Sequence, residues 1–433
     1  MAHFGVVAPA FFSHFNALEA LAGELAARGH RVTFLQRPDA AAFLRDPLAA
    51  FHAVGADRYP AGSLAASLRR AANPGGPLGL RGVILDMARS TDMLCHALPR
   101  AIDALGIDAI IADQMEAAGG LVAEGLGIPF VSVACALPVN REPGIPLPVM
   151  PFAYADDARG HQMVEGSTRV YDWMMGPHRR SIDANARRLG LGGRGALHEC
   201  LSPLAQVSQT IEAFDFPRRA LPPHFHHVGP LRRPNGRGSA PDHAPMPAIA
   251  PGRPFVFASL GTLQGQRFGL FKRIATACRA LDAQLLVAHC GGLDAGQERA
   301  LERHGATWVC AFANQGAVLA HADAVVSHAG LNTVMDAISA RTPILALPIA
   351  FDQPGAAARV VHAGIGLKAS PRFAGSATLR GQLARLLGES SFATRLEAMS
   401  SSVETAGGAA RAASIVESAL GLGQVRESVA AGG

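Results

Sequence analysis

Short apolar runs alternate along the chain with longer segments whose apolar residues recur at helical spacing. Continuous apolar runs indicate strands that are buried on both faces, and helices between them indicate β-α-β units with a parallel sheet. In the first unit, residues 3–8 are a predicted strand, residues 16–28 a helix that ends at Gly29, and residues 31–36 the next strand. We predict further strands at residues 107–112, 130–134, 255–259, 285–289, 324–327 and 344–347, and a helix at residues 333–340.

A segment without periodicity divides this pattern into two α/β halves. Residues 231–254 are rich in Pro, Gly, Arg and Ala, which is a composition typical of linkers. The 433 residues suffice for two cores, because a single core stops growing at roughly 250–300 residues. We therefore expect a first domain over residues 1–232, a linker over 233–253, a second domain over 254–421 and a flexible tail over 422–433.

Composition excludes several classes of protein. A net charge of +5 from 39 basic and 34 acidic residues, without a run of Lys or Arg, indicates a mildly basic enzyme and no nucleic-acid partner. Six scattered cysteines without a C-x-x-C pair are typical of reduced thiols in a cytoplasmic protein. Met1 directly precedes the first strand, so we expect no signal peptide, and no apolar stretch reaches the roughly 18–20 residues that span a bilayer. Neither half carries G-x-G-x-x-G after its first strand, which argues against a nicotinamide or flavin enzyme.

The residues around the start of the predicted helix at 333–340 can bind an anion. A helix N-terminus presents unpaired N–H groups and a partial positive charge. Gly330 lets the backbone approach the anion closely, Thr333 can add a hydroxyl, and His328 can add a ring N–H. Asp336, one turn further along, can reach a ribose hydroxyl. These residues predict a site for a nucleotide diphosphate.

A second loop adds a pair of polar side chains. Residues 342–349 form an apolar run that contains prolines, and Asp352 and Gln353 follow just past its end. A carboxylate that accepts hydrogen bonds, beside an amide, suits the fixed pattern of hydroxyls on a sugar. The phosphate-binding helix followed by this polyol-binding pair predicts a nucleotide-sugar ligand.

His14 and Asp113 are candidates for acid–base chemistry. Ligands of parallel sheets bind outside the carboxyl ends of the strands. We expect His14 in the loop at the carboxyl end of the first strand, and Asp113 directly follows the strand at 107–112. If a sugar is transferred to an alcohol, a base must take the proton of the hydroxyl, and a neutral imidazole can do so near pH 7. A carboxylate that bonds to the other ring nitrogen fixes the tautomer of the imidazole. A histidine in such a loop is more often a surface or capping residue, so the residues alone leave both interpretations open.

Three clustered histidines raise the question of a metal. In a strand His224 and His226 would share a side, but neither they nor His227 have a nearby Cys or carboxylate to complete a ligand set. A polar strand entry is the favoured interpretation, and we expect no metal.

The block from 312 to 353 is the most informative part of the sequence. Its ordered residues resemble the donor-binding signature of UDP-dependent glycosyltransferases of the two-domain GT-B type. Segments 8–14, 112–114, 137–143, 228–231 and 258–264 extend the resemblance over nearly the whole chain, to the branch that acts on hydroxylated carotenoids. The signature residues are Phe312, Gln315, Val318, Leu319, His328, Gly330, Asn332, Thr333, Asp336, Pro343, Asp352 and Gln353.

This resemblance implies an α/β fold of two Rossmann-like domains that face a cleft, and the activity of an inverting UDP-glucosyltransferase. It further implies that His14 and Asp113 form the catalytic dyad and that Phe312 lies against the base. UDP-glucose would be the donor substrate, without any cofactor. The residues implied in binding UDP-glucose are Ser259, Gly261, Thr262, Phe312, Gln315, His328, Gly330, Asn332, Thr333, Asp336, Asp352 and Gln353.

The acceptor implied by the resemblance is a hydroxylated carotenoid such as zeaxanthin, glucosylated at both ends. The apolar run at 146–152 lacks periodicity and would line the acceptor site, although core filling is the default interpretation of such residues. Since a carotenoid resides in the membrane, we expect a cytoplasmic enzyme in peripheral contact with the inner face of the cytoplasmic membrane. The residues expected to line the acceptor site are Phe11, Phe12, Pro148, Met150, Phe152, Trp173, Met174 and Met175.

Two alternatives stay open at this point. A macrolide or aromatic polyketide glycosyltransferase has the same fold and differs only in its acceptor half. A non-catalytic nucleotide-sugar binding module would lack a base such as His14.

Overall fold

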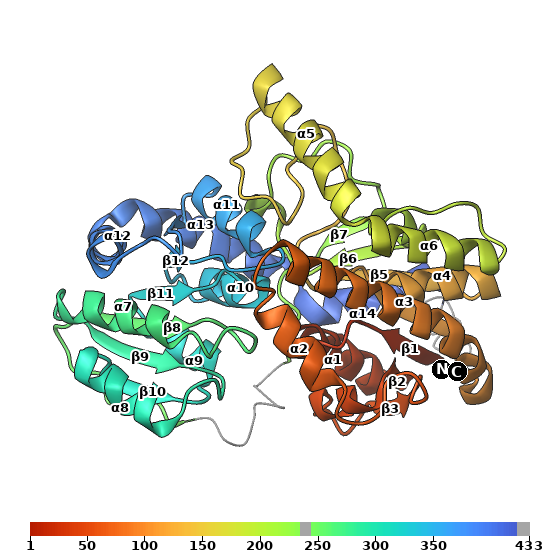
Figure 1. Cartoon of the computed structure of the whole chain (residues 1–433), viewed down its shortest axis with the longest axis horizontal. Coiled ribbons are helices and arrows are strands. Elements are labelled where there is room, and N and C mark those ends of the chain that lie inside the picture. Colours follow the sequence, from red (N-terminus) through yellow and green to blue (C-terminus); the bar gives the residue numbers. More distant parts are fainter. Residues whose placement is uncertain (234–243, 422–433) are drawn as a thin grey trace, which may run out of the picture.

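Two parallel sheets, one of seven strands and one of six, organise the residues that the computed structural model describes, 1–233 and 244–421 (Figure 1). Every strand pair in both sheets is parallel, as the continuous apolar runs predicted. Part of the predicted linker, residues 234–243, and the predicted tail, residues 422–433, lie outside the described residues.

The first sheet has the strand order β3-β2-β1-β4-β5-β6-β7. The strands predicted in this half are present, with ends that differ by at most two residues. The apolar pattern missed the short strands β3 and β6, whereas β7 agrees with the strand entry favoured for the three clustered histidines. The strands are β1 (His3–Val7), β2 (Arg31–Gln36), β3 (Ala50–Ala53), β4 (Ala109–Asp113), β5 (Phe130–Ala134), β6 (Gln206–Ser208) and β7 (Phe225–His227).

Helices cover both faces of the first sheet. On one face the core includes α1 (Phe12–Ala27), and on the other it includes α3 (Pro77–Leu105), α4 (Ala117–Leu126) and α6 (Gly176–Arg188). Helix α5 (Ala158–Met174) projects away from the body of the molecule (Figure 1). The remaining helices of this half are α2 (Leu64–Ala72) and the 3₁₀ turns Pro38–Phe43, Leu197–Cys200 and Glu212–Phe214.

The second sheet has the order β10-β9-β8-β11-β12-β13. The order reverses between β8 and β11, and crevices for ligands form where the strand order of such sheets reverses. The predicted strands of this half are again present. The strands are β8 (Phe255–Ser259), β9 (Gln284–Ala288), β10 (Trp308–Cys310), β11 (Ala324–Ser327), β12 (Ile344–Ala346) and β13 (Gly366–Lys368).

Seven helices pack on the described part of the second sheet, four on one face and three on the other. The first face carries α9 (Gln315–Leu319), α10 (Leu331–Ser339), α11 (Gln353–His362) and α13 (Ser390–Ala406). The opposite face carries α7 (Phe268–Arg279), α8 (Ala295–His304) and α12 (Ser376–Gly388). Among all described helices, none combines the length and the apolar character needed to cross a bilayer.

The two halves share buried contacts. Ile211 and Phe214 of the first half belong to the apolar core around α10 and α11 of the second. Arg359 of α11 donates a hydrogen bond to Asp215 of the first half (Nε–Oδ1 2.6 Å), and its guanidinium lies 4.2 Å from the ring centroid of Phe216. Both charged side chains of this ion pair are buried. The halves are therefore held together by apolar and ionic contacts as well as by the chain.

The last described helix, α14 (Gly408–Ala419), returns to the first half. Its buried face, which includes Ala412 and Val416, joins the apolar core formed by β1 and α1. Glu417 accepts hydrogen bonds from Arg28 (2.7 Å) and from His30 (3.0 Å). The expected second domain, residues 254–421, would include α14. In the structure α14 packs on the first domain instead, because it buries apolar residues of α1.

Candidate active site

A cavity of about 1280 Å³ lies between the two halves. It is lined by loops at the carboxyl ends of strands in both sheets, where ligands of parallel sheets bind. The cavity brings together most of the residues predicted from the sequence. Those that line it are Phe11, Phe12, His14, Pro148, Met150, Met174, Met175, Ser259, Gly261, Thr262, Phe312, Gln315, His328, Gly330, Asn332, Thr333, Asp336, Asp352 and Gln353.

His14 and Asp113 form a hydrogen-bonded pair at one side of this cavity. The Nδ1–H of His14 donates to Oδ2 of Asp113 at 2.7 Å, and Oδ1 of Asp113 accepts from the backbone N–H of Met115 at 2.9 Å. Asp113 is fully buried, and the His14 ring lines the cavity. This arrangement leaves Nε2 of His14 available to a ligand, as a general base requires.

The expected position of His14 in a loop was wrong. Helix α1 begins at Phe12, four residues before the predicted start, so His14 lies in the first helical turn. The N-cap residue, Phe11, makes no capping hydrogen bond through its side chain, so the sequence carries no signal for this early start. The helical turn fixes the backbone of His14, which a loop would not do.

Opposing effects act on the pKa of His14. Burial lowers this pKa, but the charge of Asp113, its hydrogen bond and the charge of Asp352 outweigh burial and raise the pKa above its usual value. The imidazolium form is therefore stabilised by two carboxylates. A base whose conjugate acid is stabilised in this way takes a proton more readily.

On the opposite side, His328 lies between two glycines. A Cβ atom on Gly261 would lie 2.6 Å from Cε1 of the His328 ring, and one on Gly330 would lie 2.5 Å from Nε2. Both positions thus need glycine to make room for the ring, and Gly261 also has a positive φ of 74°. Burial lowers the pKa of His328 to about 4, so near pH 7 this ring is neutral and can donate a hydrogen bond.

Helix α10 begins at Leu331, two residues before the predicted start, with Gly330 at its N-cap. The side chain of Asn332 bridges to the first half, because its Nδ2 donates to the carbonyl of Ser13 (3.1 Å) and its Oδ1 accepts from Gln209 (2.9 Å). The hydroxyl of Thr333 donates to Oε1 of Gln315 (3.2 Å). The backbone N–H groups at the start of α10 remain as the anion-binding groups.

Arg232 is a site residue that the sequence analysis missed. Its Nε donates to Oδ1 of Asp336 (2.7 Å), whose Oδ2 accepts from Gln315 (2.7 Å), and its Nη2 donates to the carbonyl of Asn332 (2.9 Å). Arg232 also lines the cavity. The only available signal was its position directly after the segment 228–231 that carries the resemblance.

Asp352 and Gln353 adopt different hydrogen-bonding roles. The Oε1 atom of Gln353 accepts the backbone N–H groups of Ile349 and Ala350, both at 2.8 Å, so its Nε2 is left to donate. Asp352 accepts the N–H of Leu137 of the first half at 3.1 Å, and burial raises the pKa of Asp352. Together the pair offers an acceptor and a donor to a ligand that carries several hydroxyls.

The wall of the cavity in the first half combines apolar side chains with charged ones, among them Arg37, Glu116 and Arg141. Helices α2 and α3, to which the sequence analysis assigned no element, supply Leu68, Ile84 and Met87, among other residues. Two of the residues expected to line the acceptor site are not brought to the cavity. Phe152 does not line the cavity, and Trp173 lies on the outer surface of α5 with 80% of its side chain exposed, because α5 projects into solvent.

One group of described side chains has ligand atoms close enough to hold a metal. It consists of His14, Asp113 and Cys135, whose ligand atoms lie within 4.8 Å of one another. Burial raises the pKa of the Cys135 thiol well above its usual value, which disfavours the thiolate that binds metals. Since Asp113 already bonds His14, we interpret the group as a hydrogen-bonded dyad beside a neutral thiol.

Comparison with known proteins agrees with this geometry. Residues 205–403 match the model of the family described as UDP-glucoronosyl and UDP-glucosyl transferase. A zeaxanthin glucosyltransferase of Pantoea ananas is 49% identical over 429 residues, which cover 98% of this chain and 97% of the relative. A zeaxanthin glucosyltransferase of Pseudescherichia vulneris is 47% identical over 423 residues, which cover 97% and 98% of the two chains.

The fold is also that of solved glycosyltransferases. The crystal structure of the glycotransferase of kitacinnamycin superimposes with a TM-score of 0.71 at 22% identity, over 96% of this chain and 98% of that one. This likeness confirms the GT-B architecture of two Rossmann-like domains facing a cleft. The chain therefore belongs to the zeaxanthin glucosyltransferase family of UDP-dependent glycosyltransferases.

Proposed function

We propose that the protein transfers glucose from UDP-glucose to the hydroxyls of zeaxanthin, first to one end and then to the other. The observation that carries this proposal is the His14–Asp113 hydrogen bond (2.7 Å) in one cavity with the anion-binding start of α10 and with Asp352 and Gln353. The names of the two full-length relatives support the donor and acceptor.

In the proposed reaction, Nε2 of His14 takes the proton of the acceptor hydroxyl as its oxygen attacks the anomeric carbon of glucose. The bond from that carbon to the diphosphate breaks on the opposite face, so the product is a β-glucoside and UDP leaves. Asp113 holds the His14 tautomer and stabilises the imidazolium until the proton passes to solvent.

The second half would hold the donor. The N–H groups at the start of α10 and the neutral ring of His328 would donate to the diphosphate, and Asp336 would contact the ribose. Asp352 would accept from glucose hydroxyls while Nε2 of Gln353 donates to one, and Phe312 would lie against the base. We propose that no metal takes part, because these donors supply the positive potential. Transfer at an unchanged rate in EDTA is the expected result.

The first half would hold the acceptor. A carotenol is rigid and almost without polar groups, so burial of apolar surface, at roughly 25 cal/mol per Å², would provide most of its binding energy. Only the ring that carries the hydroxyl needs to enter the cavity beside His14. Because the rest of the polyene stays in lipid, we expect the enzyme to associate peripherally with the inner face of the cytoplasmic membrane.

The test is incubation of the purified protein with UDP-glucose and single carotenoids in detergent micelles, followed by mass analysis of the products. We expect two glucoses on zeaxanthin, one on β-cryptoxanthin and none on β-carotene, which has no hydroxyl. A product from a macrolide or an aromatic polyketide, with none from zeaxanthin, would contradict the proposed acceptor and leave the donor site standing.

A further inference from the structure

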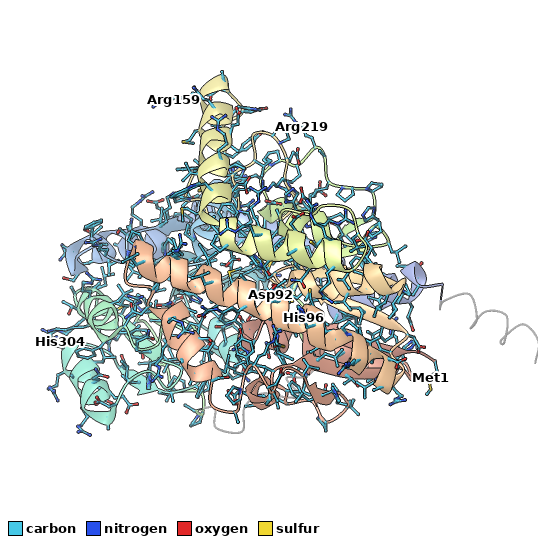
Figure 2. The ribbon with its side chains drawn as sticks, turned by 45° about the vertical axis from the view of Figure 1, so that its right-hand side comes forward. Met1, Asp92, His96, Arg159, Arg219 and His304 are labelled. Carbon is cyan, nitrogen blue, oxygen red and sulfur yellow. The ribbon has the colours of Figure 1, made fainter. Side chains whose placement is uncertain are left out.

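Helix α5 carries an apolar face that no other described element covers. It projects from the body in both views, and Figure 2 shows Arg159 at its free end. Met163, Val170 and Trp173 are exposed and lie on one side of the helix, since they are seven and three residues apart. Trp173 stands at the end of α5 that joins the body. An exposed Trp beside aliphatic residues is typical of a surface that meets the lipid–water interface.

A second exposed segment that contains apolar residues comprises the loop after α2 and the first turns of α3. Residues 73–81 include Pro, Gly and Leu and are mostly exposed, and Leu78 has 87% of its side chain in solvent. The start of α3 lies near the base of α5 in both views. We define the docking surface as Met163, Val170 and Trp173 of α5 together with Leu78 and Leu80 of this segment.

Two residues of the docking surface also line the cavity. Leu80 and Val170 are partly exposed and also line the cavity, one from each segment. The cavity therefore reaches the exposed surface at both segments, where Leu80 and Val170 offer apolar contacts to a ligand that enters. A bilayer is the partner that matches an apolar rim around an opening for an apolar ligand.

The charges near this surface favour an anionic bilayer. Arg69 of α2 and Arg81 in the first turns of α3 are exposed, and neither forms an ion pair within the described chain. At the free end of α5, the exposed Arg159 lies beside the exposed carboxylates Asp156 and Asp157, so the unpaired positive charge of the surface is carried by the segment at 73–81 and by α2. Arg169 is paired with Glu165 on the same helix (2.8 Å).

We propose that the docking surface binds a bilayer that contains anionic lipid, with Trp173 and Leu78 in the interface and the cavity opening towards the acyl chains. This inference rests on the proposed carotenoid acceptor and adds the residues that reach it in the membrane. Neither Trp173 nor Leu78 lines the cavity, so both can be changed without altering the reaction centre.

The experiment compares wild type with Trp173→Ser, Leu78→Ser and the double variant in flotation with vesicles of phosphatidylcholine and phosphatidylglycerol. Phe373→Ser is the matched control, because Phe373 is 79% exposed and lies in the second half, away from the cavity. We expect wild type and Phe373→Ser to float equally and the double variant to bind at least tenfold more weakly. Binding of the double variant equal to wild type would overturn the proposal.

A second readout separates this proposal from the proposed function. Each variant is assayed for UDP release with zeaxanthin in detergent micelles and with zeaxanthin in the same vesicles. The double variant should keep the wild-type rate in micelles and lose at least tenfold in vesicles, whereas an equal loss in both would overturn the proposal. A wild type that releases no UDP with zeaxanthin in micelles contradicts the proposed function, while flotation still tests the docking surface.

Discussion

Removal of either partner of the His14–Asp113 pair is the sharpest test of the proposed reaction. His14→Ala removes the base, and general base catalysis contributes about 10²–10⁴ in rate. That range equals about 2.7–5.4 kcal/mol of transition-state stabilisation at 1.36 kcal/mol per decade. Asp113→Ala removes one charged hydrogen bond (2.7 Å), which contributes about 1.5–3 kcal/mol, so turnover should fall about 10- to 150-fold.

Asp113→Asn should be the more damaging change at this position. The amide can keep the hydrogen bond from the N–H of Met115, but its NH₂ group would face Nδ1 of His14. The ring must then carry its proton on Nε2, the nitrogen that has to accept the proton of the hydroxyl. We expect a loss close to that of His14→Ala, and a His14→Ala, Asp113→Ala double variant should lose little more, because Asp113 acts through His14.

The assay is UDP release at saturating substrates as a function of pH, with UDP-glucose binding measured by calorimetry as the control. His14 acts as a base only when it is neutral, so turnover should rise with pH through its raised pKa. In Asp113→Ala the burial that lowers the pKa of His14 remains, while the carboxylate that raises it is lost. The rise of turnover with pH should therefore occur at lower pH than in wild type. Near-wild-type turnover of His14→Ala, fully multiplicative losses in the double variant, or an unmoved acid limb would each refute the dyad.

Three further results are expected. Gln353→Ala should weaken UDP-glucose and leave UDP affinity nearly intact, because UDP has no sugar; equal calorimetric losses for both would contradict its assignment to glucose. UDP-glucose should bind more tightly as the pH falls from 7 to about 5, because a diphosphate beside His328 raises the pKa of this ring above the value of about 4 that burial gives it. His328→Gln, which keeps a donor that does not titrate, should lose this pH dependence. Asp215→Ala should lower the free energy of unfolding by about 3–5 kcal/mol, since it leaves Arg359 buried without its partner. The same change at Asp183, which pairs with Arg187 on an exposed helix face, should have little effect in thermal unfolding.

Much of the fold was predictable because buried parallel strands have a strong sequence signal. The runs at Phe130–Ala134 and Phe255–Ser259 match β5 and β8 residue for residue. The strands that were missed, such as Gln206–Ser208 and Ala50–Ala53, are short and contain polar side chains, so no apolar run marks them. The packing of α14 was not predictable either, since an Ala-rich helix can cover either half.

Site residues were predictable where a residue with a characteristic chemistry follows a predicted strand. His14, Asp113 and Asp352 could be proposed from their positions after strands, and the structure brings their charges within reach of one another. Arg232 could not, because an arginine beside a linker is usually solvated and only the fold places it against Asp336. Trp173 was misplaced for a related reason: sequence shows that α5 has apolar residues but not that the helix leaves the body of the protein.

The return of α14 to the first half sets a rule for exchanging halves between relatives. A chimera cut only once, near residue 233, would join the first half of one enzyme to the α14 of another, and Ala412 and Val416 would then meet a foreign α1. The donor half is better exchanged as a segment that is joined to the first half at two positions, one near residue 233 and one before α14. The second junction belongs at Gly407, the left-handed turn between α13 and α14, where a new sequence can begin without interrupting either helix. Chimeras built with both junctions would keep each acceptor half with its own closing helix.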